Sequence, residues 1–156
     1  METLFGVIFL FDLTNFNVRN KPHTDEQLLQ KIKSLQGFER FWYEVLSSKN
    51  FKGKENSSKL WTGSVFITTA DLLHNYKEYN KGAEKYQPLQ VTQVLETIKK
   101  ICPKSKINIR EFINTFQGKQ QLRGVRLPCI GAARQDFCDY IGHEINWGDD
   151  DSDDKN

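Results

Sequence analysis

The sequence predicts a mainly α-helical fold with a small β component, in the α+β class. Five segments carry apolar residues at the three- and four-residue spacing of one helix face. A further stretch is rich in β-branched and aromatic residues and contains a glycine that can turn it into a hairpin. The 156 residues include eleven Phe, five Tyr and three Trp, enough large side chains for a packed core in one domain or two small ones.

The first 23 residues do not indicate one structure. Residues 1–13 contain the run LFGVIFLF, which favours a buried strand, yet Leu4, Ile8 and Phe11 also mark one helix face. Residues 14–23 are typical of a loop. The apolar run is shorter than the roughly 18–20 residues of a membrane span. It also lacks the basic flank and the small-residue cleavage site of a signal peptide, so we expect neither a membrane segment nor a leader.

Two helices are expected next, and they complete a predicted helical lobe over residues 1–47. Thr24 and Gln27 have the spacing of a capping box, which predicts the start of a helix, and Gly37 is expected to end that helix. Its apolar side carries Leu28, Ile32 and Leu35. The apolar face of the second helix carries Phe38, Phe41, Trp42 and Val45.

A polar linker is predicted at residues 48–60, where Ser, Lys and Asn are frequent and hydrophobic periodicity is weak. A second lobe is expected over residues 61–148. It opens with a short strand at Gly63–Ile67, after which Thr68 and Asp71 give a second box-like helix start. The inward face of this helix is expected to carry Leu72, Leu73, Tyr76 and Tyr79.

An amphipathic helix is expected after a loop over residues 80–88, and it stops before Pro103. Its apolar face carries Val91, Val94, Leu95, Ile98 and Ile101. Residues 106–116 and 120–127 are then expected to form a hairpin that turns at Gly118.

A last helix over about residues 131–141 closes the second lobe. It is expected to end at Gly142 and to bury Ala133, Phe137 and Ile141. The resulting order of strand, helix, helix and hairpin is that of a winged helix-turn-helix, in which the second helix reads DNA and the basic hairpin is the wing. The second lobe is therefore predicted to be winged-helix-like.

The net charge of +2 hides an uneven distribution of charged residues. Residues 149–156 contain five Asp and one Lys, so that 21 basic and 15 acidic residues precede them. We expect this acidic tail to be disordered, because like charges repel and no apolar residue is present to pack. The tail either competes with DNA for a basic surface, docks on a basic patch of a partner, or serves only to raise solubility.

Residues 97–126 concentrate positive charge. Eight basic residues and a single acidic one, Glu111, give this stretch a local charge of +7. Such a charge suits phosphate binding, although a merely solvated face is an equally plain interpretation. We expect six of them to form one basic surface on the wing, namely Lys104, Lys106, Arg110, Lys119, Arg123 and Arg126. The candidate DNA-binding residues are Lys99, Lys100, Lys104, Lys106, Arg110, Lys119, Arg123 and Arg126.

Recognisable motifs for catalysis or cofactor binding are absent from the sequence. It has no glycine-rich phosphate loop, nucleophile elbow, zinc-protease motif or kinase loop, and His23, His74 and His143 are scattered. Cys129, Cys138 and His143 lack the close spacing that holds two zinc ligands on one turn. Three cysteines cannot all pair, which favours a reduced, cytoplasmic protein.

Two carboxylates, Asp136 and Asp139, lie three residues apart on the last predicted helix. Such a pair can bind a cation or divide acid and base roles, but surface acids near Arg134 are the better interpretation. We therefore expect no catalytic residue, no metal site and no cofactor in this chain.

Several spaced elements resemble a known group of replication proteins. The segment Asp12–Leu35 and the FERFWYEVL that follows Gly37 resemble the region just after the ATPase in primase–helicases of bacteriophages and mobile elements, whose motor is a superfamily 3-type helicase. The matching positions are Asp12, Leu13, Thr14, Phe16, Arg19, Pro22, Thr24, Asp25, Gln30, Lys31, Ser34 and Leu35. The second lobe is similar too, in its Trp61 strand, its TADLLHNYKEY helix and its closing Arg-Gly, Leu-Pro, Ala-Arg-x-x-Phe, Gly and Trp series over Arg123–Trp147.

The chain departs from that family in what it lacks. No Walker motif, arginine finger or primase domain is present in the 156 residues. The chain is therefore expected to be either an excised C-terminal portion or a short protein that kept only this portion. The resemblance implies DNA handling in replication, without ATP hydrolysis or primer synthesis by these residues.

Two functions follow from these observations. The first is a DNA-binding accessory region that grips the phosphates of forked or single-stranded DNA through the basic wing. The second is a protein-interaction module, in which Phe41 and Trp42 of the aromatic segment contact a helicase core or a second copy. The plainer role of these two side chains is to close the helical lobe.

Overall fold

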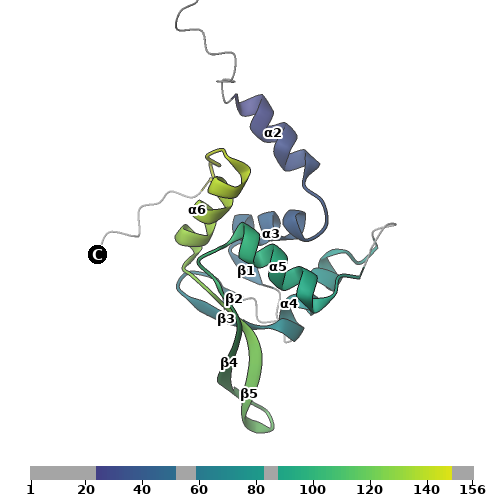
Figure 1. Ribbon diagram of the computed structural model, residues 1–156, viewed down its shortest axis with the longest axis vertical. Coiled ribbons are helices and arrows are strands. Elements are labelled where there is room, and N and C mark those ends of the chain that lie inside the picture. Colours follow the sequence, from purple (N-terminus) through teal and green to yellow (C-terminus); the bar gives the residue numbers. More distant parts are fainter. Residues whose placement is uncertain (1–23, 52–58, 83–87, 149–156) are drawn as a thin grey trace, which may run out of the picture.

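The computed structural model describes residues 24–51, 59–82 and 88–148 (Figure 1). Within these ranges, five helices accompany a three-stranded antiparallel sheet and a two-stranded one, which confirms the α+β class. The elements are α2 (Asp25–Ser34), α3 (Gly37–Ser48), β1 (Asn50–Phe51), β2 (Lys59–Leu60), β3 (Val65–Thr68), α4 (Thr69–Tyr79), α5 (Val91–Ile101), β4 (Lys106–Thr115), β5 (Gly118–Leu127) and α6 (Ile130–Ile141). The predictions for residues 1–23 and for the acidic tail at 149–156 lie outside the described residues.

Polar caps start the helices where the sequence predicts. The Thr24 hydroxyl accepts a hydrogen bond from the Gln27 N–H at 3.4 Å and begins α2. The Thr68 hydroxyl accepts from the Asp71 N–H at 3.0 Å and donates to the Asp71 carboxylate at 2.7 Å, which begins α4. These bonds satisfy N–H groups that have no partner inside the helix.

Glycine ends one helix as predicted but not another. Gly142 follows α6 in the left-handed conformation, with φ of 75°, and its N–H donates to the Cys138 carbonyl at 2.8 Å. Gly37, expected to end α2, is instead the first residue of α3. Helix α2 ends earlier, at Ser34, where the Leu35 N–H bonds the Ile32 carbonyl.

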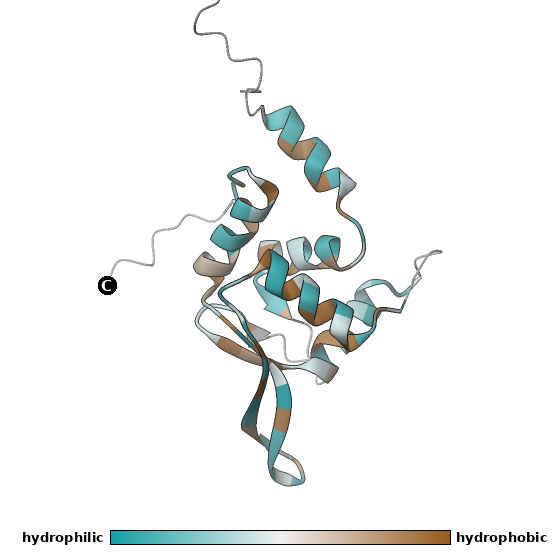
Figure 2. Cartoon of the chain, in the orientation of Figure 1, coloured by the Kyte–Doolittle hydropathy of each residue, from teal (hydrophilic) through white to brown (hydrophobic). Residues whose placement is uncertain are grey.

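The core is continuous across the two predicted lobes. Trp42 of α3 packs against Phe51 and Trp61, with ring centroids 6.3 and 5.8 Å apart, so the polar stretch predicted at residues 48–60 does not divide the core among the described residues. Hydrophobic residues alternate with hydrophilic ones along α5 (Figure 2), and its apolar side faces this core. Of the residues expected inside, Trp42, Leu72, Ile98 and Phe137 are fully buried, and Leu95 is 5 % exposed.

Some residues at helix ends are exposed, although hydrophobic periodicity predicts that they are buried. Val91 opens α5 and Tyr79 closes α4, and both side chains are exposed. Periodicity assigns a face to every residue of a helix, but only the turns that lie over another element bury that face.

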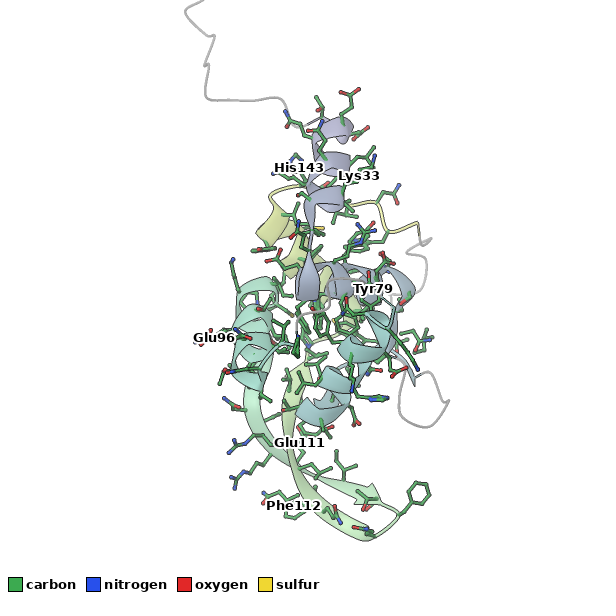
Figure 3. The ribbon with its side chains drawn as sticks, turned by 90° about the vertical axis from the view of Figure 1, so that its right-hand side faces the viewer. Lys33, Tyr79, Glu96, Glu111, Phe112 and His143 are labelled. Carbon is green, nitrogen blue, oxygen red and sulfur yellow. The ribbon has the colours of Figure 1, made fainter. Side chains whose placement is uncertain are left out.

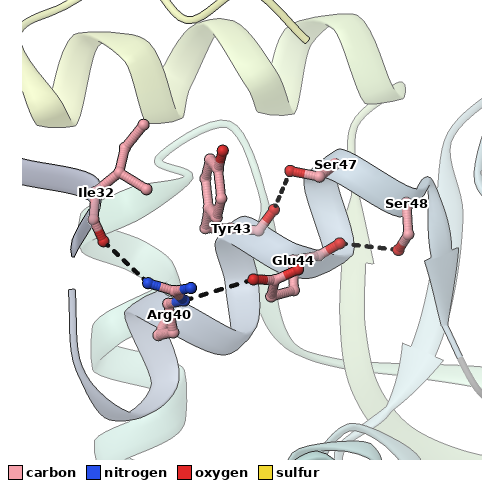
Figure 4. A network of polar contacts seen from close by, with 6 residues as sticks. All are labelled: Ile32, Arg40, Tyr43, Glu44, Ser47 and Ser48. Atoms are coloured by element: carbon pink, nitrogen blue, oxygen red, sulfur yellow. Dashed lines mark hydrogen bonds and ion pairs between the residues drawn. The ribbon is translucent and has the colours of Figure 1, made fainter. Parts of the chain in front are cut away.

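Helix α2 stands apart from the body (Figure 1) and has no fully buried residue; Leu28 and Ile32 are only half-buried. Two cations attach it. The Arg40 guanidinium of α3 donates to the Ile32 carbonyl at 3.3 Å and pairs with Glu44 at 3.5 Å (Figure 4). The Lys31 ammonium donates to the Ile141 carbonyl at the end of α6, at 3.0 Å. Helix α2 is thus held by these polar contacts and by the half-buried Leu28, which packs against the core.

The three-stranded sheet has the order β3-β5-β4, so β5 is the central strand. Strand β3 pairs with β5 only from Leu127 to Gly124, whereas β4 and β5 continue to pair up to Thr115 and Gly118. Beyond Gly124, the two strands therefore form a two-stranded hairpin that projects from the body (Figure 1). The structure confirms the predicted hairpin and its turn at Gly118, where φ is 101°.

Gly124 lies where the third strand ends. A Cβ atom at this position would lie 2.2 Å from the Ile67 carbonyl oxygen and 2.9 Å from Cα of Thr68. Both atoms belong to the backbone of β3, which cannot move without breaking its pairing with β5. Glycine is therefore required at this position if β3 is to pair with β5 as far as Thr68 and Gly124.

Candidate nucleic-acid interface

The projecting hairpin has two different faces. Strand residues point alternately to the two sides of a sheet, and the register places Arg110 opposite Arg123, Phe112 opposite Gln121, and Asn114 opposite Lys119. These six residues share one side, which we call the basic face. By the same alternation in β5, this is the side on which Val125 and Leu127 enter the core. The basic face is thus the continuation of the core side of the sheet beyond the body.

The cations of the basic face are exposed and uncompensated. No carboxylate lies among its six residues, and Arg110, Lys119 and Arg123 have no ion-pair partner among the described residues. Arg110 and Arg123 lie directly opposite one another, an arrangement of like charges that destabilises a strand pair. Packing does not explain why cations occupy these positions.

The opposite face carries a compensated arginine. The Arg126 guanidinium donates to both carboxylate oxygens of Glu111, from Nε at 2.6 Å and from Nη2, and it lies over the Phe66 ring at 6.0 Å. These hydrogen bonds to Glu111 raise the pKa of Arg126. Lys106 is opposite Arg126 in the register and shares this face. The expectation of one basic surface over all the wing residues is therefore wrong for Arg126 and Lys106.

A bulge explains the position of Lys106. Without it, Lys106 and Arg110 would share a face, because they lie four positions apart along the strand and side chains alternate with a period of two. The register shifts between Lys106 and Ile109, and Asn108 adopts a left-handed φ of 56°. One extra residue in β4 reverses the alternation, so Lys106 moves to the side of Arg126.

The three remaining candidate lysines lie outside the hairpin. Lys99 and Lys100 are exposed on α5, and the Lys100 ammonium lies 5.3 Å from the centre of the Tyr140 ring. Lys104 is anchored by Asp136, which accepts from its ammonium and from its backbone N–H, each at 3.1 Å. The hydrogen bond of the ammonium to Asp136, and then the negative charge of that carboxylate, raise the pKa of Lys104. Of the eight candidates, the structure thus brings Arg110, Lys119 and Arg123 together on one face.

No family model, curated protein or solved structure matches this chain. The resemblance to phage primase–helicases therefore stays a prediction, and the argument for function depends on the site itself.

The charged residues near the end of the chain have structural roles that the sequence does not reveal. Asp136, expected at the surface, is 4 % exposed and holds Lys104 in place. Burial, and then the adjacent Asp136, raise the pKa of the Cys102 thiol to about 12. Arg134 is also buried, and its guanidinium donates twice to the Leu46 carbonyl, at 3.0 and 2.8 Å. It thereby satisfies a carbonyl in the last turn of α3.

The candidate partner contacts are core residues. Phe41 is 4 % exposed and Trp42 is 0 % exposed, so neither forms a surface that a partner can contact. The centroid of the Phe41 ring lies 5.6 Å from that of Tyr76 on α4, and Trp42 packs on Trp61. The structure therefore supports the plainer interpretation, in which both residues close the core.

The described residues contain no group of three His, Cys, Asp or Glu side chains placed to hold a metal ion. All three cysteines are free; Cys102 and Cys138 are buried and Cys129 is exposed. Within the same ranges, no helix is both long and apolar enough to cross a membrane.

Two exposed aromatic residues of the hairpin were not among the candidates. Phe112 is 64 % exposed on the basic face and Phe116 is 95 % exposed in the turn between β4 and β5. Figure 3 shows Phe112 near the far end of the hairpin, well away from the helices. A signal was present in the sequence, because strand alternation from Arg110 places Phe112 on the same side.

Proposed function

We propose that this chain is a DNA-binding accessory region of a phage or mobile-element replication protein, which binds DNA phosphates through the basic face of the β4–β5 hairpin. The main support for this proposal is that Arg110, Lys119 and Arg123 lie exposed on one face with no carboxylate among the residues of that face. Neutralising phosphates with such cations releases counterions from DNA, which supplies affinity without sequence preference.

The order of elements supports a winged-helix interpretation. After helix α3 and the short strands β1 and β2, the order is strand β3, helices α4 and α5, and strands β4 and β5. In the three-stranded sheet, β5 lies between β3 and β4. In a winged helix-turn-helix, α5 is the reading helix and the β4–β5 hairpin is the wing. Lys99 and Lys100 on α5 then become additional phosphate contacts.

The protein-interaction alternative has lost its motivating observation. It depended on an exposed aromatic face at Phe41 and Trp42, and both side chains are buried. The cations of the basic face, in contrast, are exposed and have no carboxylate partner among the described residues, so DNA is better supported as a ligand than a protein partner. A merely solvated face is the other interpretation of these cations, and the following test distinguishes it from DNA binding.

A pair of charge-reversal variants tests the proposal. Lys119→Glu/Arg123→Glu alters the basic face, whereas Lys33→Glu/Lys77→Glu makes the same change in net charge at exposed positions on α2 and α4. Binding of fluorescent forked and single-stranded DNA is measured by anisotropy at about 50 mM salt. We expect the hairpin variant to bind at least about ten-fold more weakly and the control variant to stay within about three-fold of the wild type.

Thermal unfolding of both variants shows whether the fold is kept, and we expect no loss because all four side chains are exposed. The proposal fails if the folded wild-type chain does not bind either DNA. It also fails if both variants weaken binding equally, because net charge alone would then account for the affinity.

A further inference from the structure

The hairpin exposes phenylalanine side chains, whereas phenylalanines in the body of the protein are buried. Phe38, Phe41, Phe51 and Phe137 are all buried, whereas Phe112 and Phe116 are 64 % and 95 % exposed. Burying a Phe side chain stabilises a fold through the hydrophobic effect, and this stabilisation is largely forgone at both positions. Folding therefore gives no reason for two phenylalanines on a hairpin that has no core of its own.

Phe112 lies among cations and amides. Arg110 and Asn114 flank it along β4 on the same face, and Gln121 lies opposite it on β5. The Lys119 ammonium lies 5.3 Å from the centre of its ring. Aromatic rings beside cations are the composition of surfaces that bind single-stranded nucleic acid.

Phe116 is presented by a turn that its own hydrogen bonds fix. The Thr115 hydroxyl donates to the Gly118 carbonyl at 2.8 Å and accepts from the Gln117 N–H at 3.3 Å. The Gln120 amide donates to the Gln117 amide oxygen at 3.1 Å. Phe116 is the one apolar side chain of this turn. The ring is therefore held outward at the tip.

From this arrangement we infer that Phe112 and Phe116 stack on unpaired DNA bases, so that the hairpin prefers single-stranded DNA to duplex. The inference rests on the proposed function, since the cations bind the phosphates and the rings bind the bases. In a duplex, neighbouring base pairs cover the faces of each base, and only unpaired bases offer a face to these rings. Aromatic hot-spot residues of protein–protein interfaces differ from these two rings, because such residues occupy well-packed apolar pockets.

The test uses three DNA probes with the full chain. The first is a mixed-sequence single strand of about 15 nucleotides, the second is its duplex, and the third is an abasic strand of the same length. The abasic strand keeps the phosphates and lacks the bases, so it reports the cation contacts alone. The protein variants are Phe112→Ala/Phe116→Ala and, as the conservative control, Phe112→Trp/Phe116→Trp.

We expect the alanine variant to bind the single strand at least about 30-fold more weakly, because stacking is worth about 1–3 kcal/mol per base and the variant removes two rings. Its affinity for the duplex and for the abasic strand should stay within about two-fold of the wild type. The tryptophan variant should retain binding to the single strand, and its fluorescence should be quenched by that strand but not by the abasic one.

The outcomes separate the two proposals. If the wild type binds the normal and abasic strands equally and the alanine variant binds the single strand as the wild type does, the rings do not stack, and phosphate binding stands alone. An equal loss on the normal and abasic strands would also overturn stacking. If the wild type binds none of the three probes, the proposed function itself fails.

Discussion

The base and the tip of the β4–β5 hairpin use the same strands for different purposes. On one side of β5, Val125 and Leu127 are buried in the core, while Arg123, Gln121 and Lys119 continue the same side beyond the body. The backbone alternation does not change at Gly124; only the surroundings do. Where helices cover this side, the residues are aliphatic, and where nothing covers it they are cationic or polar.

Two arginines show the same contrast. Arg134 is buried, donates twice to the Leu46 carbonyl and lies 4.9 Å from the centre of the Trp147 ring, so its charge is committed to the fold. Arg123 is exposed on the basic face and lies opposite another arginine. The number of cations in a segment therefore says little about DNA binding until the partners of those cations are known.

The strongest test of the contrast replaces one phenylalanine in each region. Phe137→Ala removes a fully buried ring from the core and should lower the free energy of unfolding by about 3–5 kcal/mol. Phe112→Ala removes an exposed ring and should change that free energy by no more than about 0.5 kcal/mol. Urea unfolding measures both values, and a large loss for Phe112→Ala would mean that the hairpin packs on something.

The junction between the two regions should be almost as sensitive. Gly124→Ala places a Cβ atom against the backbone of β3 and should destabilise the fold by about 2–3 kcal/mol. Gly131→Ala is the matched control, because a Cβ there meets nothing within 4 Å and lies in the first turn of α6. Thermal unfolding should show the control unchanged or slightly more stable, and equal effects would remove the explanation for Gly124.

A smaller effect should appear with pH in the body alone. The folded pKa of Cys102, about 12, lies above the ordinary thiol value of 9.0, so the folded state holds this proton more tightly than the unfolded chain. The stability that this provides is present below pH 9 and is lost as the pH rises toward 12, by about 1 kcal/mol at pH 10. Cys102→Ser does not titrate in this range, so its urea-unfolding free energy should fall less between about pH 8 and pH 10.

An equal fall in the wild type and in Cys102→Ser would assign the alkaline loss to other groups. Tyr140 is one such group, because burial, and then Glu39, raise its pKa as well. DNA binding to the exposed cations of the hairpin should not follow the Cys102 titration.

Local signals in the sequence predicted the elements well. Thr24, Thr68 and Gly142 each mark a helix end where expected, and Gly118 turns the hairpin. Such features depend on neighbouring residues and are readable without the fold. The error at Gly37 has a local reason too, since a glycine with positive φ can begin the next helix as well as end the last.

The candidate site was predicted only in part because its geometry depends on contacts distant in the sequence. The bulge at Asn108 moves Lys106 to the other face, and Arg126 finds Glu111 across the strands. Asp136 is 32 residues from Lys104 along the chain, and spacing on one helix cannot reveal that pairing. The sequence shows that positive charge is concentrated in residues 97–126 but does not show which of these cations have a carboxylate partner.

The salt dependence of single-stranded DNA binding is the most direct test of whether the basic face of the hairpin binds DNA phosphates. Each phosphate contact contributes about −0.7 to the slope of log K against log salt for a single strand. Arg110→Gln and Arg123→Gln, which lie on the basic face, should each make the slope about 0.7 shallower. Lys106→Gln removes the same charge from the opposite face and should leave the slope unchanged. Equal slopes for all three variants would contradict the assignment of DNA binding to this face.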